Sequence, residues 1–211
     1  RKSKGIAGVE KMTEIKICGL TTKTAIDTAI QSGASYLGFV FAESPRKITP
    51  ENVRALTQDL PEKVKKVGVF VSPTKEFVEE IVKIAQLDFV QIHGEKKFQQ
   101  LDVPIIRAKS VTKNVSLTVA TGEDFLLLDA PPTKYMGGNG QRFDWSVVAV
   151  QQLEKEKLWL AGGLTAENVG EAIAYFHPKV VDVSSGVETD GKKDLAKISA
   201  FCEAVRIADN S

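Results

Sequence analysis

The sequence of 211 residues has little cysteine, little histidine and almost no net charge. Its two cysteines, Cys18 and Cys202, lie far apart, which excludes the disulfide framework of a small secreted domain and favours a reducing, cytoplasmic setting. Lysine and arginine total 28 against 27 acidic residues, so the net charge of +1 gives no electrostatic case for a nucleic-acid partner. No apolar run reaches the ~18 residues that a bilayer-spanning helix needs, so no membrane partner is expected.

The first eleven residues differ from the rest of the chain. Residues 1–11 are polar, and they lack the apolar stretch of a secretory signal. We expect them to be an added remnant or a disordered extension, with the native start at Met12. Residues 12–211 have no linker or low-complexity segment, and they are expected to form one domain.

Short apolar runs alternate with stretches of helical period along the whole chain. Because these runs are continuously apolar, they predict parallel strands covered on both faces. The predicted strands are 15–18, 36–41, 67–71, 89–92, 105–108, 125–129, 158–161 and 180–184. The predicted helices are 22–32, 50–59, 74–86, 165–176 and 193–207, with weaker signals at 95–100 and 112–121.

This repeated strand–helix order predicts an α/β protein, a single-domain (β/α)8 TIM barrel. A doubly wound open sheet is the alternative, but that fold concentrates its glycines in the first turn. Here the first turn, at 18–21, is Cys-Gly-Leu-Thr, and the glycine-rich turns follow the last two predicted strands instead.

Polar residues gather where the predicted strands end, which is where such barrels carry their active sites. Two late turns, 162–165 and 183–188, offer backbone N–H groups and could hold one phosphate between them. Alternatively, their glycines only permit tight turns. The strand-end set is Cys18, Arg46, His93, Arg107, Asp129, Gly162, Gly163, Asp182, Ser184, Ser185 and Gly186.

Four of these side chains have two interpretations each. Asp129 ends a buried run, so desolvation should raise its pKa as a general acid requires, although it could equally pair with an arginine or cap a turn. Cys18 is either an inert small hydrophobe or a base whose thiol pKa is lowered by nearby helix N-termini. His93 is either a hydrogen-bonding or binding residue or a base, and no second ligand at metal spacing appears beside it. Arg46 is either a surface residue or a bidentate partner for a carboxylate.

Segments spread over most of the chain resemble the phosphoribosylanthranilate isomerase family of tryptophan biosynthesis. The matching segments are KICGLT at 16–21, LGFVFAESPRKI at 37–48, GVFV at 68–71, VQIHGE at 90–95, LLLDA at 126–130, GGNGQRFDW at 137–145, LAGGLTAENV at 160–169 and VDVSSGVE at 181–188. The resemblance implies an Amadori rearrangement of an aminoaldose phosphate to a ketose, with no metal or organic cofactor. It also implies a monomer or a homodimer. The glycine-rich loop 137–140 is either a mobile lid or simply flexible.

The resemblance also implies roles for individual residues. The catalytic cysteine and aspartate of the family fall on Cys18 and Asp129, and the arginine linked to the anthranilate carboxylate falls on Arg46. The phosphate-binding turns fall on Gly162-Gly163 and Ser184-Ser185-Gly186. His93 and Asp182 match motif positions, and we include them among the substrate-binding residues.

Two other functions remain as alternatives. The related aminoaldose isomerase of histidine biosynthesis pairs aspartates at the ends of its first and fifth strands, where this chain has Cys18 and the stretch 107–109. A non-catalytic phosphate-binding or flavin-mononucleotide-binding barrel would explain the glycine turns, but it would not explain Cys18 and Asp129.

Overall fold

The computed structural model describes residues 12–95, 100–110, 123–129 and 154–211. Several predicted features lie outside the described residues. They are the proposed extension 1–11, the weak helix at 112–121, most of the weak helix at 95–100 and the glycine-rich loop 137–140.

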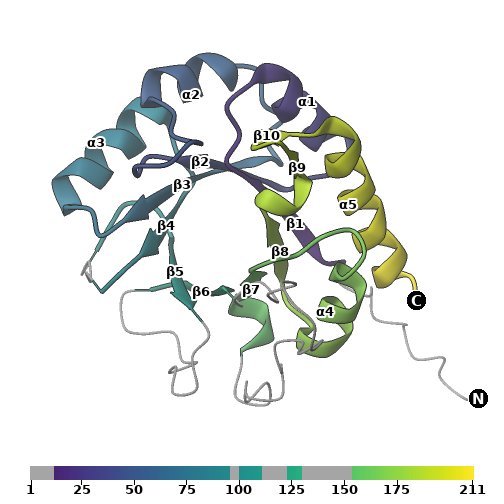
Figure 1. The fold of residues 1–211 in the computed structure, drawn as a ribbon. Coiled ribbons are helices and arrows are strands. Elements are labelled where there is room, and N and C mark those ends of the chain that lie inside the picture. Colours follow the sequence, from purple (N-terminus) through teal and green to yellow (C-terminus); the bar gives the residue numbers. More distant parts are fainter. Residues whose placement is uncertain (1–11, 96–99, 111–122, 130–153) are drawn as a thin grey trace, which may run out of the picture.

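Eight parallel strands close into a barrel in sequence order, and Figure 1 looks into it. Strand β1 pairs with both β2 and β8, so the (β/α)8 prediction is confirmed and the open-sheet alternative is wrong. The strands are β1 (Glu14–Cys18), β2 (Tyr36–Val40), β3 (Lys65–Val71), β4 (Phe89–His93), β5 (Ile105–Ser110), β6 (Phe125–Asp129), β7 (Leu158–Ala161) and β8 (Val180–Val183).

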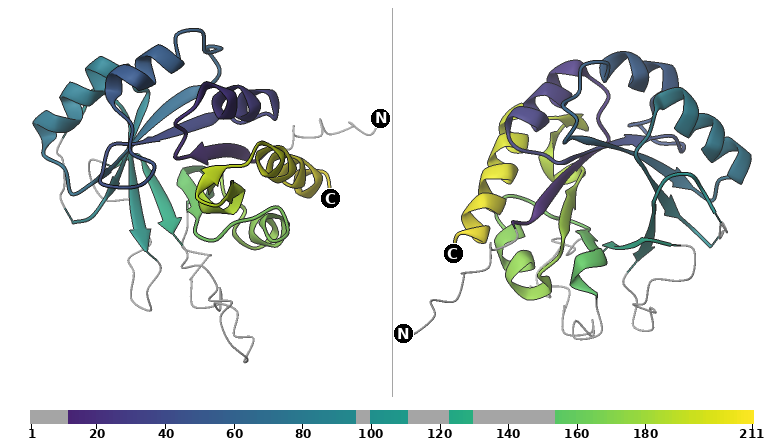
Figure 2. Two further views of the ribbon diagram at one scale, coloured as in Figure 1. Left: turned by 45° about the horizontal axis from the view of Figure 1, so that its top comes forward. Right: turned by 180° about the vertical axis from the view of Figure 1, so that it is seen from behind.

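The described helices lie outside the barrel, as Figures 1 and 2 show. Threonine begins the first three, because its side-chain oxygen accepts a hydrogen bond from a backbone N–H of the first turn. The helices are α1 (Lys23–Gln31), α2 (Pro50–Leu56), α3 (Lys75–Ala85), α4 (Val169–Phe176) and α5 (Leu195–Asp209).

Most helix boundaries differ from the predicted ones by one to four residues, and three of the differences have a clear local cause. Helix α2 ends at Leu56, and the Thr57 hydroxyl then donates to the carbonyl of Val53 at 2.6 Å. Helix α4 starts at Val169 because Asn168 closes the preceding turn with its side chain, accepting from the N–H of Thr165 at 2.8 Å. Helix α5 begins after Asp194, which caps it. The segment before that cap is a hairpin of β9 (Glu188–Thr189) and β10 (Lys192–Lys193).

Two apolar clusters hold the barrel together. The larger, the outer cluster, fills the space between strands and helices and includes Ile15 and Ile17 of β1. The smaller, the inner cluster, includes Tyr36 and Trp159, whose ring centroids are 4.6 Å apart, with Phe89 and Phe125 packed against it. These four aromatic residues stand at or near the amino ends of their strands, so they fill that end of the barrel and leave the carboxyl end for a site.

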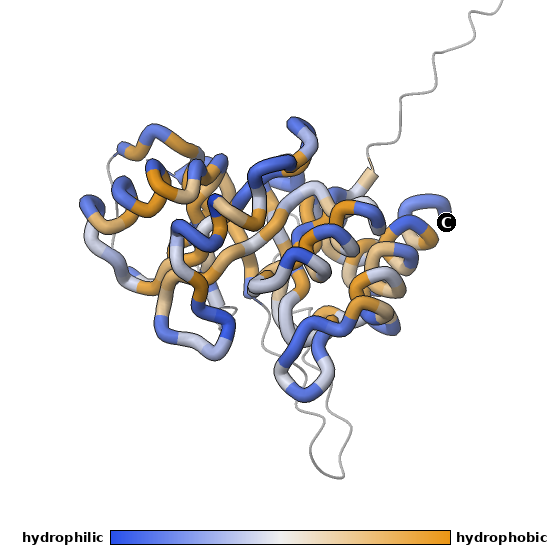
Figure 3. Tube along the Cα trace, turned by 90° about the horizontal axis from the view of Figure 1, so that it is seen from above, coloured by the Kyte–Doolittle hydropathy of each residue, from blue (hydrophilic) through white to orange (hydrophobic). Residues whose placement is uncertain are grey.

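Strand β1 departs from the uniformly apolar pattern that the sequence analysis assumed. Its apolar residues Ile15 and Ile17 belong to the outer cluster, and the residues between them alternate to the other face of the sheet. Lys16 is fully buried there and pairs with Asp182 of β8 at 2.9 Å. Figure 3 shows the contrast between the largely apolar strands and the polar turns that join them to the helices.

Candidate active site

A cavity of about 440 Å³ lies at the carboxyl ends of the barrel strands. Every residue to which the family resemblance gave a role lines it: Cys18, Arg46, His93, Asp129, Gly162, Gly163, Asp182, Ser184, Ser185 and Gly186. Residues from six different strands or their following loops therefore meet at one place. A larger cavity of about 790 Å³ beside α2 and α3 is lined mainly by apolar side chains and contains none of these residues.

Arg107 is the one residue of the strand-end set that does not line this cavity. Its guanidinium pairs with Glu123 at 2.6 Å and donates to the carbonyl of Gly94 at 3.0 Å. The neighbouring Ile106 and Ala108 belong to the inner cluster, and strand side chains alternate, so Arg107 faces the other side of the sheet. The direction of the Arg107 side chain does not follow from the sequence alone, because it depends on which residues of the strand face the barrel interior.

The thiol of Cys18 lies in the wall of the cavity, and it is buried. One of the two interpretations was a thiol whose pKa is lowered by nearby helix N-termini, and the direction found here is the opposite. Burial raises the pKa of the Cys18 thiol because it penalises the thiolate, and the nearby ammonium of Lys16 only partly offsets this. The thiol therefore needs a further positive charge close by before it loses its proton readily.

Asp129, at the end of β6, has the property that the sequence predicted. Burial raises the pKa of its carboxyl group, and the negative charge of Asp182 raises it further. A carboxylic acid with a raised pKa keeps its proton closer to neutral pH, as a general acid must.

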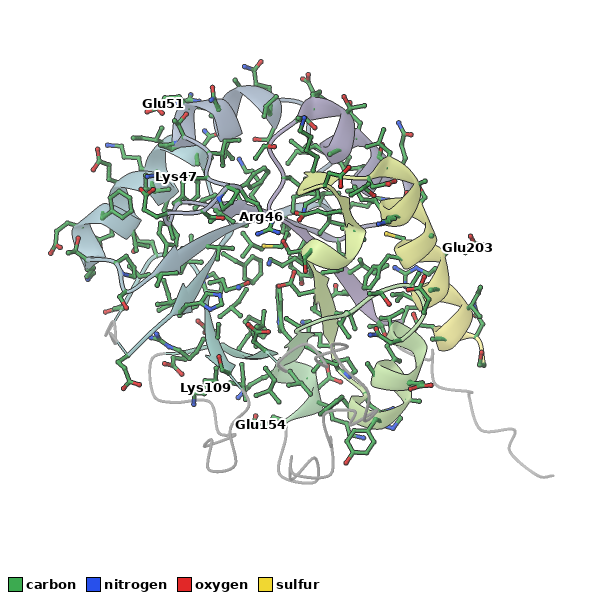
Figure 4. The ribbon with its side chains drawn as sticks, in the orientation of Figure 1. Arg46, Lys47, Glu51, Lys109, Glu154 and Glu203 are labelled. Atoms are coloured by element: carbon green, nitrogen blue, oxygen red, sulfur yellow. The ribbon has the colours of Figure 1, made fainter. Side chains whose placement is uncertain are left out.

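Arg46 reaches over the middle of the barrel mouth, as Figure 4 shows. Its Nε and Nη2 atoms donate to the two carboxylate oxygens of Glu188 at 2.7 and 2.6 Å. Lys193 also donates to Glu188, at 2.5 Å, and to the carbonyl of Ser184 at 3.0 Å. The Arg46 side chain is 30% exposed, but it is not a free surface group, because it pairs with the buried carboxylate of Glu188.

His93 and Asp182 belong to a polar layer beneath the cavity mouth. The side-chain nitrogen Nε2 of Gln91 lies 2.9 Å from Nε2 of His93. Burial lowers the pKa of His93, and the positive charge of Lys16 adds to the effect, so neutral imidazole is favoured. The Oδ2 atom of Asp182 accepts from Lys16, whereas its Oδ1 atom is buried without a hydrogen-bond partner among the described residues.

The two glycine-rich turns meet beside this layer. Gly162 and Gly163 follow β7, and the 3-10 turn Ser185–Val187 follows β8. The two turns touch so closely that a Cβ atom on Gly186 would lie 1.9 Å from the carbonyl oxygen of Leu164. Position 186 therefore requires glycine, and the close approach brings two sets of backbone amides together, as a phosphate site in this part of a barrel requires.

This contact gives a first prediction. Replacing Gly186 with alanine should push the two turns apart, destabilise the fold by about 1–3 kcal/mol and weaken binding of a phosphorylated ligand. Denaturant unfolding and calorimetric titration with inorganic phosphate would measure both effects. Gly170→Ala in α4 is the matched control, since its added Cβ would meet only Ala208, at 3.7 Å. Unchanged stability and phosphate affinity in the Gly186 variant would contradict the description of the turns.

Two further observations concern cofactors and membranes. In the described part of the chain, no three histidine, cysteine, aspartate or glutamate residues gather in a way that could hold a metal ion. None of the described helices is long and apolar enough to cross a membrane.

Sequence reasoning missed three residues of this site: Lys16, Glu188 and Lys193. Lys16 could have been found, because it is a lysine within an apolar strand and a buried charge requires a partner. The signal for the other two was the pair Asp190-Gly191, whose φ angles of 50° and 74° form the turn of the β9–β10 hairpin. Asp-Gly is a strong hairpin sequence because both positions need positive φ.

Comparison with known proteins identifies the family. The family model described as N-(5'phosphoribosyl)anthranilate (PRA) isomerase matches residues 15–204. The chain belongs to this family. An N-(5'-phosphoribosyl)anthranilate isomerase of Streptococcus mutans is 48% identical over 198 residues, covering 92% of this chain and all of that protein. The Listeria monocytogenes protein of the same name is 43% identical over 198 residues, covering 91% of this chain and 98% of its own.

Solved structures agree with this family membership. TrpF from Jonesia denitrificans is 36% identical with a TM-score of 0.81, covering 92% of this chain and 97% of its own. A phosphoribosyl anthranilate isomerase in complex with reduced 1-(o-carboxyphenylamino)-1-deoxyribulose 5-phosphate is 32% identical with a TM-score of 0.76, covering 92% and 99% of the two chains. A Thermotoga maritima relative was solved as monomers generated from a dimeric enzyme, at 32% identity, with a TM-score of 0.74 and coverage of 92% and 99%.

Proposed function

We propose that this chain converts N-(5'-phosphoribosyl)anthranilate to 1-(2-carboxyphenylamino)-1-deoxyribulose 5-phosphate, a step of L-tryptophan biosynthesis. One observation carries the proposal: Cys18 and Asp129 line the same cavity as the paired glycine turns. A base, an acid and an anion site are the groups that an acid–base rearrangement of a phosphosugar needs. Membership of the isomerase family supports the same reaction.

In the first proposed step, Asp129 acts as the general acid. Its carboxyl group donates a proton to the furanose ring oxygen. The bond between that oxygen and C1' breaks, and the nitrogen lone pair forms a C1'=N bond, giving an open-chain iminium ion. The raised pKa of Asp129 supports this role, because the group must be protonated before the step.

In the second step, Cys18 acts as the general base. Its thiolate removes the proton from C2', and the electrons of that C–H bond form a C1'=C2' bond while the nitrogen becomes neutral. The resulting enolamine tautomerises to the ketone. Although burial raises the thiol pKa, the iminium cation formed in the first step attracts a thiolate strongly at low dielectric. The thiol therefore loses its proton to water at the open end of the cavity only after the acid has acted, and the thiolate left behind is the base.

The remaining cavity residues would bind and orient the substrate. The turns with Gly162-Gly163 and Ser184-Ser185-Gly186 would hold the phosphate, and Asp182 and His93 would contact the sugar. Arg46 would hold the anthranilate carboxylate through Nη1, which its pairing with Glu188 does not use. Each acid–base group supplies about 10²–10⁴-fold in rate, and positioning by the two anionic ends supplies much of the rest.

The Arg46 role predicts a change in KM. Replacing Arg46 with methionine should raise KM about tenfold or more and lower kcat much less, because a carboxylate anchor acts on the substrate and the transition state alike. Steady-state kinetics would measure both constants. Lys47→Met on the same loop is the control, since that side chain pairs with Glu43 in solvent. An unchanged KM in the Arg46 variant would rule out the anchor.

Complementation tests the whole proposal. A tryptophan auxotroph that lacks only this isomerase should grow without tryptophan when it expresses this chain, and it should not grow when the chain carries Cys18→Ala and Asp129→Ala together. Failure of the folded wild-type chain to restore growth would contradict the proposed function.

We further infer that the enzyme works in the cytoplasm on a small molecule, as a monomer or a homodimer, with no nucleic-acid partner. Both cysteines are free thiols, which supports a reducing setting. The formal net charge of +1 gives no attraction to nucleic acid.

A further inference from the structure

The residues that hold Arg46 also set the charge of the place where it would bind a carboxylate. Arg46 and Glu188 form a bidentate pair, and such a pair carries no net charge. A neutral pair attracts an anion poorly, and the carboxylate of Glu188 would repel one. Lys193 also donates to Glu188, so Arg46, Glu188 and Lys193 form a three-residue cluster. Within this cluster Lys193 adds a positive charge that the Arg46–Glu188 pair lacks.

Lys193 is built into this position. It comes from β10, directly across the hairpin from Glu188 of β9. The side chains of Lys193 and Glu188 are only 6% and 7% exposed, so their charges are weakly screened by water. The ammonium group donates to Oε1 of Glu188, the same oxygen that accepts from Nε of Arg46.

The ammonium also ties the hairpin to the rest of the site. It donates to the backbone carbonyl of Ser184, in the predicted phosphate turn. The hydroxyl of Ser184 in turn donates to the backbone carbonyl of Cys18 at 3.2 Å. A chain of polar contacts thus runs from the carboxylate anchor through the phosphate turn to the strand of the proposed base.

We propose that Lys193 is a positioning and specificity-determining residue, which acts through Glu188 to orient Arg46 and leaves the three-residue cluster with one net positive charge for the carboxylate of the substrate. This inference rests on the proposed function, because it takes the anthranilate carboxylate as the anion that Arg46 binds. It adds a requirement that Arg46 alone does not imply, since a neutral Arg46–Glu188 pair should not be sufficient.

Single and double variants of the cluster should change carboxylate binding in opposite directions. Lys193→Met keeps much of the side-chain stem but leaves the cluster neutral, so carboxylate binding should weaken. Adding Glu188→Gln removes the negative charge as well and restores one net positive charge through Arg46. Lys193→Arg keeps the original charge. A purely structural role for Lys193 predicts instead that the double variant is no better than the single one.

Two stable ligands measure the effect at equilibrium. One is reduced 1-(o-carboxyphenylamino)-1-deoxyribulose 5-phosphate, and the other is the same compound without its carboxylate. The ratio of their dissociation constants, from isothermal titration calorimetry, reports carboxylate recognition separately from phosphate binding. We expect Lys193→Met to reduce this ratio roughly tenfold, and the double variant and Lys193→Arg to recover most of it. Lys192→Met, on the exposed neighbouring residue, should leave the ratio unchanged.

Unaltered discrimination in Lys193→Met would overturn the inference, as would a double variant that discriminates no better than the single one. If Lys193→Met does not fold, the double variant and Lys193→Arg still decide, because both should keep discrimination close to that of the wild type. Failure of the proposed function looks different: the wild-type chain would then bind neither ligand and show no turnover.

Discussion

Replacing Cys18 with alanine should reduce kcat by at least about 10³-fold while the dissociation constant of the reduced product analogue changes little. The reason is that the thiol of Cys18 would remove the C2' proton, and alanine has no group that can accept it. Binding should survive because the phosphate turns and Arg46 belong to other parts of the cavity. Steady-state turnover and calorimetric binding would measure the two quantities.

The second cysteine provides the matched control. Cys202 is buried in α5 within the outer apolar cluster, and burial raises the pKa of its thiol to about 11. Cys202→Ala should therefore keep its turnover, with only a modest loss of stability. Wild-type-like turnover in Cys18→Ala would remove the thiol from the mechanism.

Replacing Asp129 with asparagine should have the second large effect, a loss of about 10²–10⁴-fold in kcat, because the amide cannot donate a proton to the ring oxygen as a carboxylic acid does. The pH profile carries the more specific prediction. Burial raises the pKa of the Asp129 carboxyl, so wild-type kcat/KM should fall as pH rises through that raised pKa and the acid loses its proton. The residual activity of the asparagine variant should lack this fall.

Asp102→Asn, at an exposed carboxylate on the chain before β5, is the control, and it should leave both kcat and the pH profile unchanged. A fall at the same pH in the Asp129 variant would assign the ionisation to another group.

Much of the fold could be predicted because its signals are local. The apolar runs marked the barrel strands, and the stretches of helical period marked the helices between them. Helix α4 started later than predicted because Asn168 bonds to the N–H of Thr165 and closes a turn in place of the first helical turn. The β9–β10 hairpin was missed because it is only two residues long on each side, although Asp190-Gly191 marked its turn.

The site was harder to predict where it depends on pairing between distant segments. Cys18 and Asp129 could be named because each stands at the end of an apolar run. The burial of Lys16 against Asp182 follows from the β1–β8 register, which joins residues 166 positions apart. The outward direction of Arg107 was hidden as well, and so was the pairing of Arg46 with Glu188, because these two residues are 142 positions apart. The pKa of Cys18 depends on the pairing of Lys16 with Asp182, because these two groups act on the thiol in opposite directions.

The most direct test of the central claim follows a single hydrogen atom. The purified wild-type chain and its Cys18→Ala variant would be given N-(5'-phosphoribosyl)anthranilate with hydrogen or deuterium at C2', and formation of the ketose would be timed. The account predicts that the wild type forms the ketose more slowly from the deuterated substrate, and that the variant forms almost none. Absence of ketose with the wild type, or equal formation by the variant, would contradict it.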